Sequence, residues 1–261
     1  MNVGLYQSAV SLSALERWQE AVTQNITSNQ VAGYKKQTVQ LAMSHAGEIQ
    51  GEPSQRVGDG GGTTAWYPRA NMGISFSQGE ALPTKGDFDF ALGDDGFFAL
   101  RSADGQILYS RNGSFATTPE LDLVSHQGFE VMGEGENPIK LQSGLGGIEV
   151  DANGQITPNG AIIGKLEIMR FADNQNLISM GGGLFAASPG QEPEVVEAPG
   201  IMQGYLESAN IQPLREMVDL VGIARAYEAN PKMISHRDEI MKTPWSNLAE
   251  PARRAPSALS D

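Results

Sequence analysis

Residues 24–36 read Gln24-Asn25-Ile26-Thr27-Ser28-Asn29-Gln30-Val31-Ala32-Gly33-Tyr34-Lys35-Lys36, and this stretch closes a long helical pattern. No proline or glycine occurs between Leu5 and Ala32, and Gly33 lies where a helix would stop. The basic pair Lys35 and Lys36 follows that stop. The stretch therefore predicts one amphipathic helix that runs from residue 3 to about residue 30.

The apolar face of this predicted helix is narrow. Its positions at helical spacing are Leu5, Ser8, Leu12, Leu15, Gln19, Val22 and Ile26, and two of them dilute the face with polar side chains. A single helix with so thin an apolar face is marginal in water and needs a partner. The N-terminal segment therefore reads as an assembly element.

Residues 44–80 have no clear period and are expected to be an irregular linker. The run Gly58-Asp59-Gly60-Gly61-Gly62 is too flexible to bury much surface. A phosphate-binding loop would need a Lys-Ser or Lys-Thr pair and a preceding strand, and the sequence has neither here. The run is interpreted as a linker or loop tip.

Residues 81–204 change to the period of strands. Short apolar runs such as Phe97-Phe98-Ala99-Leu100 alternate with Asp-Gly pairs at 95–96 and 104–105 and Asn-Gly pairs at 112–113, 153–154 and 159–160. The strand that ends at Asp104-Gly105 should pair with the next one as a hairpin. Many short strands with regular turns predict a compact antiparallel β domain.

Residues 205–245 return to a helical pattern, with Leu214, Met217, Val221, Ala224 and Tyr227 near a 3–4 spacing. Pro231 interrupts this pattern and predicts a kink or local break, because proline removes a backbone hydrogen bond. After it, residues 246–261 combine proline, alanine and charge without a period and are predicted to be disordered.

The predicted fold class is α+β, with N- and C-terminal helices paired as a coiled coil and a mainly antiparallel β domain inserted between them. The expected domains are an N-terminal helix in 1–43, a linker in 44–80, the β-rich domain in 81–204, a C-terminal helix in 205–245 and the tail in 246–261.

Composition excludes several functional classes. The net charge of −13 argues against a nucleic-acid partner, because phosphate neutralisation needs clustered Lys and Arg. The absence of cysteine excludes disulfides and thiolate metal sites. No stretch approaches the roughly 18 apolar residues of a membrane span, so we expect no membrane insertion. The first residues lack a basic start and an apolar run, which predicts no cleaved signal peptide.

No residue pattern indicates catalysis, a cofactor or a metal. The three histidines, His45, His126 and His236, fall in different regions and none has a second ligand at metal spacing. The acidic stretch near Asp87 fails the calcium-loop pattern, since Ala91 and Phe98 stand at two ligand positions. No Gly-x-Ser-x-Gly elbow occurs. We therefore expect a protein without enzymatic activity.

Residues 24–36 resemble the N-terminal signature of the flagellar rod and hook proteins, in which Asn25, Asn29, Gly33, Tyr34 and Lys35 fall on its positions. Ile26 stands for the usual Leu, and Thr27 and Ser28 depart from the usual small apolar residues. The later runs that resemble the same family are Asp94-Asp95-Gly96-Phe97-Phe98-Ala99-Leu100, Tyr109-Ser110-Arg111-Asn112-Gly113-Ser114-Phe115, Gln203-Gly204-Tyr205-Leu206-Glu207-Ser208-Ala209-Asn210-Ile211, Glu216-Met217 and Arg225-Ala226-Tyr227-Glu228-Ala229-Asn230. The matches come in the family's order and span most of the chain.

The resemblance implies a subunit of the flagellar basal-body rod, a self-assembling tube that transmits torque. It implies partners among other copies, neighbouring rod and hook proteins and the flagellar type III export apparatus, with export that needs no cleaved signal. The length leaves little room for the outer domain of hook proteins, and the proximal rod is favoured over the distal rod.

The residues expected to carry assembly and packing are Leu5, Leu12, Leu15, Val22, Ile26, Asn29, Gly33, Tyr34, Leu214, Met217, Val221, Ala224, Tyr227 and Asn230. The alternatives are a hook-type or distal-rod protein, a secreted β-domain binding protein or adhesin with a helical stalk, and an enzyme that uses acidic residues of the β domain.

Overall fold

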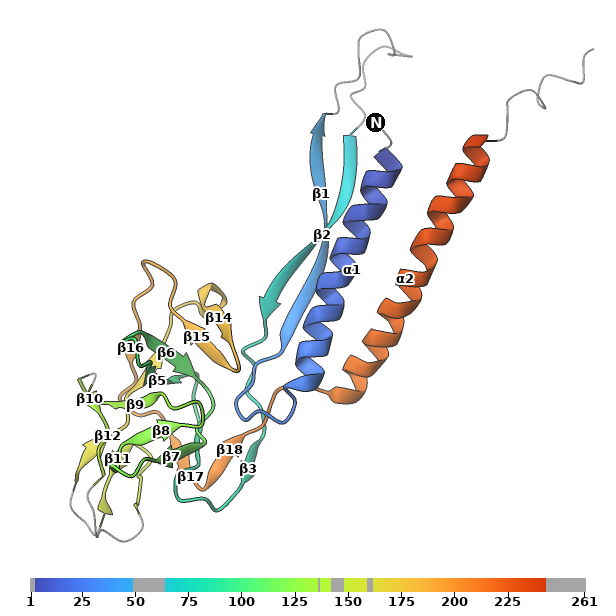
Figure 1. Ribbon diagram of the computed structural model, residues 1–261. Coiled ribbons are helices and arrows are strands. Elements are labelled where there is room, and N and C mark those ends of the chain that lie inside the picture. Colours follow the sequence, from blue (N-terminus) through green and yellow to red (C-terminus); the bar gives the residue numbers. More distant parts are fainter. Residues whose placement is uncertain (1–2, 49–63, 136, 142–147, 159–161, 243–261) are drawn as a thin grey trace, which may run out of the picture. The chain divides into compact units, whose positions relative to one another are not determined.

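The computed structural model describes residues 3–48, 64–135, 137–141, 148–158 and 162–242 (Figure 1). The predicted tail 246–261 and the glycine run 58–62 lie outside these residues. Contacts divide the chain into two compact units, one made of Met1–Gln19, Leu41–Asn71 and Asp219–Asp261 and the other of Glu20–Gln40 and Met72–Val218. The fold is α+β, as predicted.

The first unit holds most of two helices and a two-stranded sheet. Helix α1 (Val3–Thr27) begins where the sequence predicts, and its last residues belong to the second unit. It ends at Thr27 because the chain then turns, with the Val31 amide donating to the Ser28 carbonyl at 3.0 Å and Gly33 at φ +67°. Neither helix of the described chain is long and apolar enough to cross a membrane.

Strands β1 (Gln37–Glu48) and β2 (Thr64–Ile74) pair with each other and run in opposite directions (Figure 1). Two predictions are therefore wrong for these strands. Residues 37–43, predicted to belong to the N-terminal helix, belong to β1, and the segment 44–80, predicted to be irregular, contains the end of β1 and all of β2. The alternation of Val39, Leu41 and Met43 is the strand signal in this segment.

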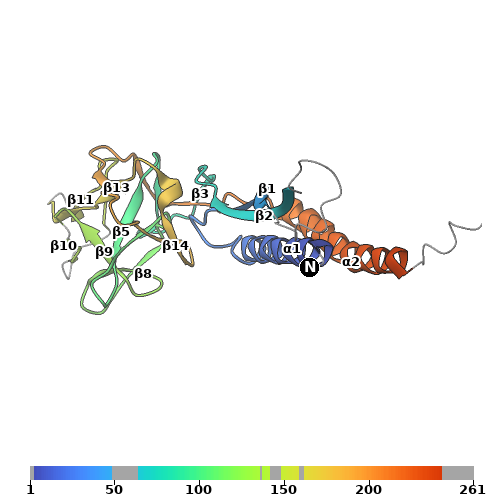
Figure 2. The same cartoon turned by 90° about the horizontal axis from the view of Figure 1, so that it is seen from above.

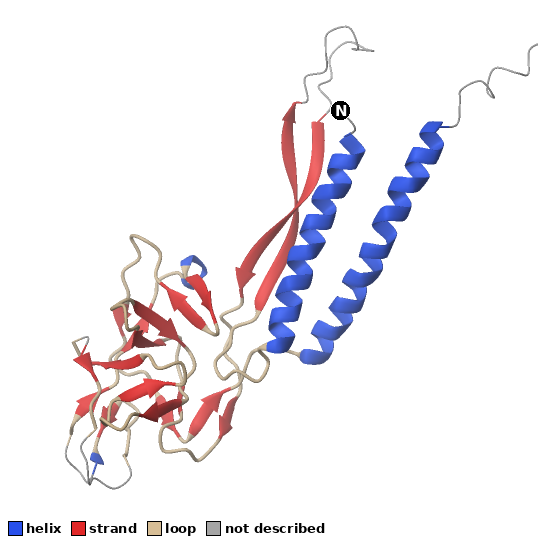
Figure 3. Cartoon of the chain, in the orientation of Figure 1, coloured by secondary structure: helices blue, strands red, loops and turns tan. Residues whose placement is uncertain are grey.

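The second unit contains the β domain, in which strands dominate (Figure 3). Its strands are β3 (Ala81–Pro83), β4 (Phe90–Leu92), β5 (Phe97–Arg101), β6 (Ile107–Ser110), β7 (Phe115–Thr117), β8 (Leu123–Ser125), β9 (Glu130–Gly133), β10 (Asn137–Pro138), β11 (Gln155–Ile156), β12 (Gly164–Lys165), β13 (Ile168–Arg170), β14 (Ile178–Gly181), β15 (Leu184–Ala186), β16 (Glu194–Val195), β17 (Ile201–Gln203) and β18 (Tyr205–Glu207), and a 3-10 turn η3 (Asn174–Asn176) precedes β14.

The largest sheet follows the order β14-β15-β6-β5-β9-β8-β7 (Figure 1). Figure 2 shows β5, β8, β9 and β14 of this sheet in a second view. The predicted hairpin at Asp104-Gly105 is confirmed, since β5 and β6 pair antiparallel and Gly105 has φ +80°. Two smaller ribbons, β17-β4 and β18-β3, bring the end of the domain back beside its beginning.

Both faces of the large sheet are buried. Phe98 and Leu100 of β5 lie in one apolar cluster, whereas Phe97 and Ala99 lie in a second one. Because successive residues of a strand point to opposite faces, β5 is the centre of a sheet with a core on each side. Full burial of a side chain of this size stabilises the fold by about 1.5–3 kcal/mol.

Helix α2 (Pro213–Lys242) starts later than predicted, because residues 205–207 form β18. Pro213 occupies its first position, where the missing amide of proline costs no helical hydrogen bond. The helix continues through Pro231 to Lys242, so a break there is wrong, and the alternative of a kink stays a prediction.

Candidate functional site

A buried cluster of charged and polar side chains lies inside the second unit. It joins the N-terminal signature stretch to the C-terminal one and to the β domain, and we call it the polar junction. Its members are Asn25, Tyr34, Lys35, Lys36, Arg111, Glu207, Asn210 and Glu216.

The centre of the polar junction is an ion pair between Lys35 and Glu207. The Lys35 ammonium donates to the Glu207 carboxylate at 2.7 Å, and the two side chains are 1% and 2% exposed. The same ammonium donates to the Ser77 carbonyl at 2.9 Å, and the Gly79 amide donates to Glu207 at 2.8 Å. Burial lowers the pKa of Lys35, and the Glu207 carboxylate opposes that shift.

Arg111 brings a second buried cation from the β domain. Its guanidinium donates to Glu207 at 3.5 Å and to Asp95 at 3.4 Å, and lies 5.4 Å from the centroid of the Phe97 ring. Burial lowers the pKa of Arg111, whereas Glu207 and Asp95 oppose this shift. Glu207 is therefore the buried anion that two buried cations share.

Asn25 joins the end of α1 to the start of β1 and to α2. Its amide oxygen accepts from the Gln37 amide at 2.8 Å and its amide nitrogen donates to the Gln37 carbonyl at 2.9 Å, so the side chain pairs with β1 as a strand residue would. The same nitrogen donates to Glu216 at 3.0 Å, and Lys36 forms an ion pair with the other Glu216 oxygen. Glu216 lies in the first turn of α2, where the helix dipole favours a carboxylate.

Tyr34 and Asn210 complete the polar junction. The Tyr34 hydroxyl donates to the Asn25 oxygen at 3.4 Å, and burial raises the pKa of this phenol, an effect that a hydrogen bond with Ser28 opposes. Asn210 accepts from the Lys36 amide at 2.7 Å and donates to the Ser75 carbonyl at 2.7 Å. Every segment that enters the junction is thus held by at least one side-chain bond to another segment.

Gly33 allows two backbones to touch beside the junction. Its amide donates to the Glu207 carbonyl at 2.7 Å, and its φ of +67° lies in the left-handed region. A Cβ atom there would lie 2.3 Å from the Arg111 carbonyl carbon. Only glycine fits both the conformation and the space.

The structure distributes the predicted assembly residues among different environments. Val22, Gly33 and Tyr34 are buried, Leu12, Leu15, Ile26, Asn29, Tyr227 and Asn230 are half-buried, Leu214, Met217, Val221 and Ala224 are exposed, and Leu5 lies in α1. The buried positions of α2 include Glu216 and Ile223, which lie on another face than the predicted seam. Tyr227 donates to Glu16 of α1 at 2.8 Å, and this bond raises the Tyr227 pKa. The assembly role of these residues stays a prediction.

Sequence reasoning missed the structural role of Lys35, Arg111, Glu207 and Glu216. All four stand inside the quoted signature runs, but no local pattern marks a charged side chain as buried. Which charged residue pairs with which distant partner is known only from the positions of both residues in the tertiary structure.

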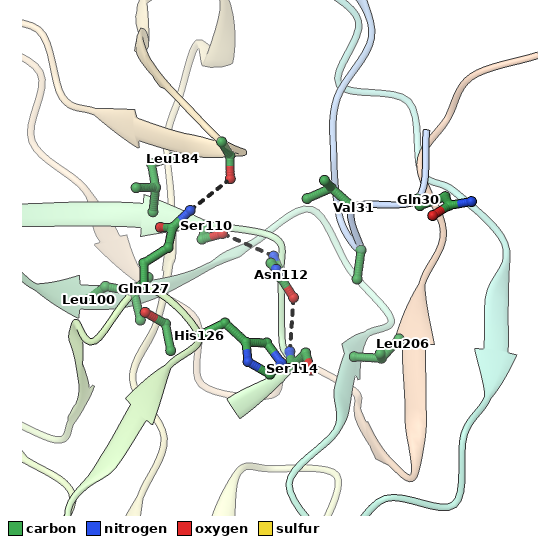
Figure 4. Close-up of a pocket in the computed structure, with 13 residues that line it drawn as sticks. Gln30, Val31, Leu100, Ser110, Asn112, Ser114, His126, Gln127, Leu184 and Leu206 are labelled. Atoms are coloured by element: carbon green, nitrogen blue, oxygen red, sulfur yellow. Dashed lines mark hydrogen bonds between the residues drawn. The ribbon is translucent and has the colours of Figure 1, made fainter. Parts of the chain in front are cut away.

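A cavity of about 400 Å³ lies within the same unit (Figure 4). Val31 of the N-terminal loop and Leu206 lie on one side of it, and Ser110, Asn112 and His126 on the other. No Asp, Glu, Lys or Arg lines it.

Ser114 and His126 at this cavity lack the arrangement of a nucleophilic pair. The Ser114 hydroxyl lies 3.0 Å from the His126 ring and donates to Asp89 at 3.2 Å. In a catalytic triad the carboxylate orients the histidine and not the serine. The described residues also hold no group of three or more His, Cys, Asp or Glu side chains able to bind a metal ion.

The chain is similar to known flagellar proteins over nearly its whole length. Residues 202–248 match the family described as flagellar basal body rod FlgEFG protein C-terminal, and residues 91–158 match the flagellar hook protein FlgE/F/G D1 domain. These matched segments contain Glu207, Asn210, Glu216 and Arg111 of the polar junction.

Three curated relatives illustrate the similarity. The flagellar basal-body rod protein FlgF of Caulobacter vibrioides is 28% identical over 96% of this chain and 99% of its own length. The rod protein FlgG of Agrobacterium fabrum is 29% identical over 92% and 97%, respectively. FlgG of Buchnera aphidicola subsp. Acyrthosiphon pisum is 31% identical over 64% of this chain and 67% of its own length.

Proposed function

Because the chain belongs to the flagellar basal-body rod protein family and is a structural subunit of the rod, not an enzyme, we propose that its terminal helices pair as a coiled coil. In this proposal the helices of one copy pack on each other and on those of neighbouring copies, and the resulting tube transmits torque. The chain assembles with other rod and hook components in the basal body.

The observation that carries this proposal is an exposed apolar face on α2. Leu214, Met217, Val218 and Val221 are 78%, 51%, 65% and 53% exposed, and their spacing places them on one face of the helix. Glu216 and Ile223, each 1% exposed, lie on a different face. A row of apolar side chains left in water costs free energy that contact with another helix would recover.

The polar junction supports the same function by holding the end of α1 beside the start of α2. The last turn of α1 carries Asn25 and the first turn of α2 carries Glu216, and these side chains bond directly. Within the second unit, Glu207 also bonds to Lys35 and to Arg111 of the β domain, and such a buried polar network holds the connected segments in one arrangement.

The proposal extends to the position of the chain in the rod, its export, its partners and its domains. We place the chain in the proximal rod, with export through the flagellar type III apparatus. We assign it no nucleic-acid partner and no membrane insertion. The axial helices occupy the two ends of the chain, and the β-rich domain between them runs from β3 to β18. The alternatives are a hook-type or distal-rod protein and an adhesin with a helical stalk.

Single carboxylates on the two terminal helices test the proposal. Leu15→Asp and Met217→Asp are expected to abolish swimming in a strain that depends on this chain, because each places a charge at a predicted helix contact. Both variants should keep a folded β domain by circular dichroism and limited proteolysis. Asn153→Asp, which adds the same charge at an exposed turn of the β domain, serves as the control.

The readouts separate the functional classes. Unimpaired motility of both helix variants contradicts assembly through these faces. Normal swimming with lost surface attachment on deletion of the chain would favour the adhesin.

A further inference from the structure

Strand β14 forms an open edge of the largest sheet. It stands at one end of the strand order and pairs on one side with β15, and within the described residues no strand pairs with its other side. All four of its residues are exposed, including Ile178 at 48% and Met180 at 53%. An unpaired strand edge presents backbone donors and acceptors to any strand that can reach it.

This edge carries no charge that would keep other strands away. From Asn174 to Gln191 the chain contains no Asp, Glu, Lys or Arg, although its net charge is −13. Natural proteins usually protect an exposed edge with charged residues, proline or a β-bulge, and of these β14 has only a register shift between Ser179 and Gly181. The uncharged edge of β14 is therefore suited to contact with another acidic molecule.

Strand β1 offers a second uncharged edge. The segment from Gln37 to Gly47 also lacks Asp, Glu, Lys and Arg, and β1 pairs only with β2 in the part of the chain that the structure describes. Leu41 and Met43 of this strand are 52% and 62% exposed. Their spacing of two residues places both side chains on one face of the strand.

We propose that β14 of one copy pairs with the outer edge of β1 of a second copy. The pairing satisfies open backbone groups of both edges and lets exposed apolar side chains of the two strands contact each other. Because the two edges differ, the contact is heterologous and leaves a free edge at each end of every assembled pair. Such a contact can repeat along a rod, whereas β14 paired with itself would close a dimer. The inference rests on the proposed rod function.

Disulfide trapping tests this contact directly, because the chain contains no cysteine of its own. Neighbouring antiparallel strands hold facing Cα atoms about 4.5–5.5 Å apart, within reach of a disulfide. One full-length preparation carries Ser179→Cys, and a second carries Ala42→Cys or, for the next register, Gln40→Cys. The preparations are mixed, concentrated until polymer sediments and oxidised. Thr117→Cys on β7, an exposed strand residue of the same sheet, replaces Ser179→Cys in the control mixture.

The expected result is a covalent heterodimer in the Ser179→Cys mixture, in a yield about tenfold above that of the control mixture. Dimers in the Ser179→Cys preparation alone would show that β14 pairs with itself and would overturn the proposal. Equal yields in both mixtures, or no covalent product, would also overturn it. Sedimentation of the same samples shows separately whether the chain polymerises, so the edge contact can fail while the rod function stands.

Discussion

Glu207→Gln removes the one buried carboxylate that Lys35 and Arg111 share, and this change is expected to be the most costly single substitution in the polar junction. The glutamine keeps the shape of the side chain and can still accept from the Gly79 amide. It leaves two cations, each with a side chain 1–2% exposed, without their buried counter-charge. Removing one partner of a buried pair costs about 3–5 kcal/mol in free energy of unfolding.

The pair between Arg101 and Glu130 provides a matched control. Its closest nitrogen–oxygen distance is also 2.7 Å, but its side chains are 32% and 40% exposed. Exposed pairs contribute about 0–1 kcal/mol because water solvates both ions and salt screens them. Glu130→Gln should therefore cost under about 1 kcal/mol, and the difference between the two variants isolates the effect of burial.

Urea unfolding followed by near-ultraviolet circular dichroism of the aromatic core measures both free energies. A third variant, Lys35→Met with Glu207→Gln, removes one of the stranded cations and should be destabilised by less than the sum of its single changes. The reasoning is refuted if Glu207→Gln costs no more than Glu130→Gln. It is also refuted if the double variant shows simple additivity.

Three further outcomes are expected. Gly33→Ala should cost more stability than Gly105→Ala, since both glycines have positive φ but only Gly33 has backbone atoms in the space of a new Cβ. Equal losses in thermal melts would contradict the close approach of the Gly33 and Arg111 backbones. Asn25→Asp should destabilise the second unit more than Asn25→Ala, because the new carboxylate faces Glu216, whereas alanine only removes hydrogen bonds. A higher urea midpoint for Asn25→Asp than for Asn25→Ala would argue against the placement of Glu216. Burial raises the pKa of Tyr34, so the unfolded chain loses this proton at lower pH than the folded chain, and the free energy of unfolding falls as pH rises above about 10. The Tyr34→Phe protein should lose less stability over that pH range. Parallel pH profiles of the two proteins would contradict the shift.

Local patterns predicted those parts of the fold that local forces decide. The uninterrupted run before Gly33 predicted α1, and Asp104-Gly105 predicted the β5–β6 hairpin, because helix stops and tight turns depend on the backbone preferences of a few neighbouring residues. The alternation of Val39, Leu41 and Met43 was equally local, but the predicted N-terminal helical domain included these residues.

Helix α2 shows where a local pattern stops being sufficient. Its apolar spacing predicted a seam through Leu214, Met217 and Val221, yet these side chains are exposed while Ile223 is buried. A hydrophobic period gives the faces of a helix but not which face the rest of the chain covers. Pro231 shows the same limit. Proline removes one helical hydrogen bond, but α2 continues beyond it to Lys242.

The sequence by itself determined the family, the α+β class and the absence of catalytic and thiolate chemistry, since these depend on residue types and on motifs within short stretches. Only the tertiary structure decided that Lys35 and Glu207, which are 172 residues apart, form one buried pair with Arg111. The physical reason is that an ion pair depends on distance and burial, and the linear order of residues fixes neither. The two signature stretches are thus two halves of one polar junction, which neither stretch could form alone.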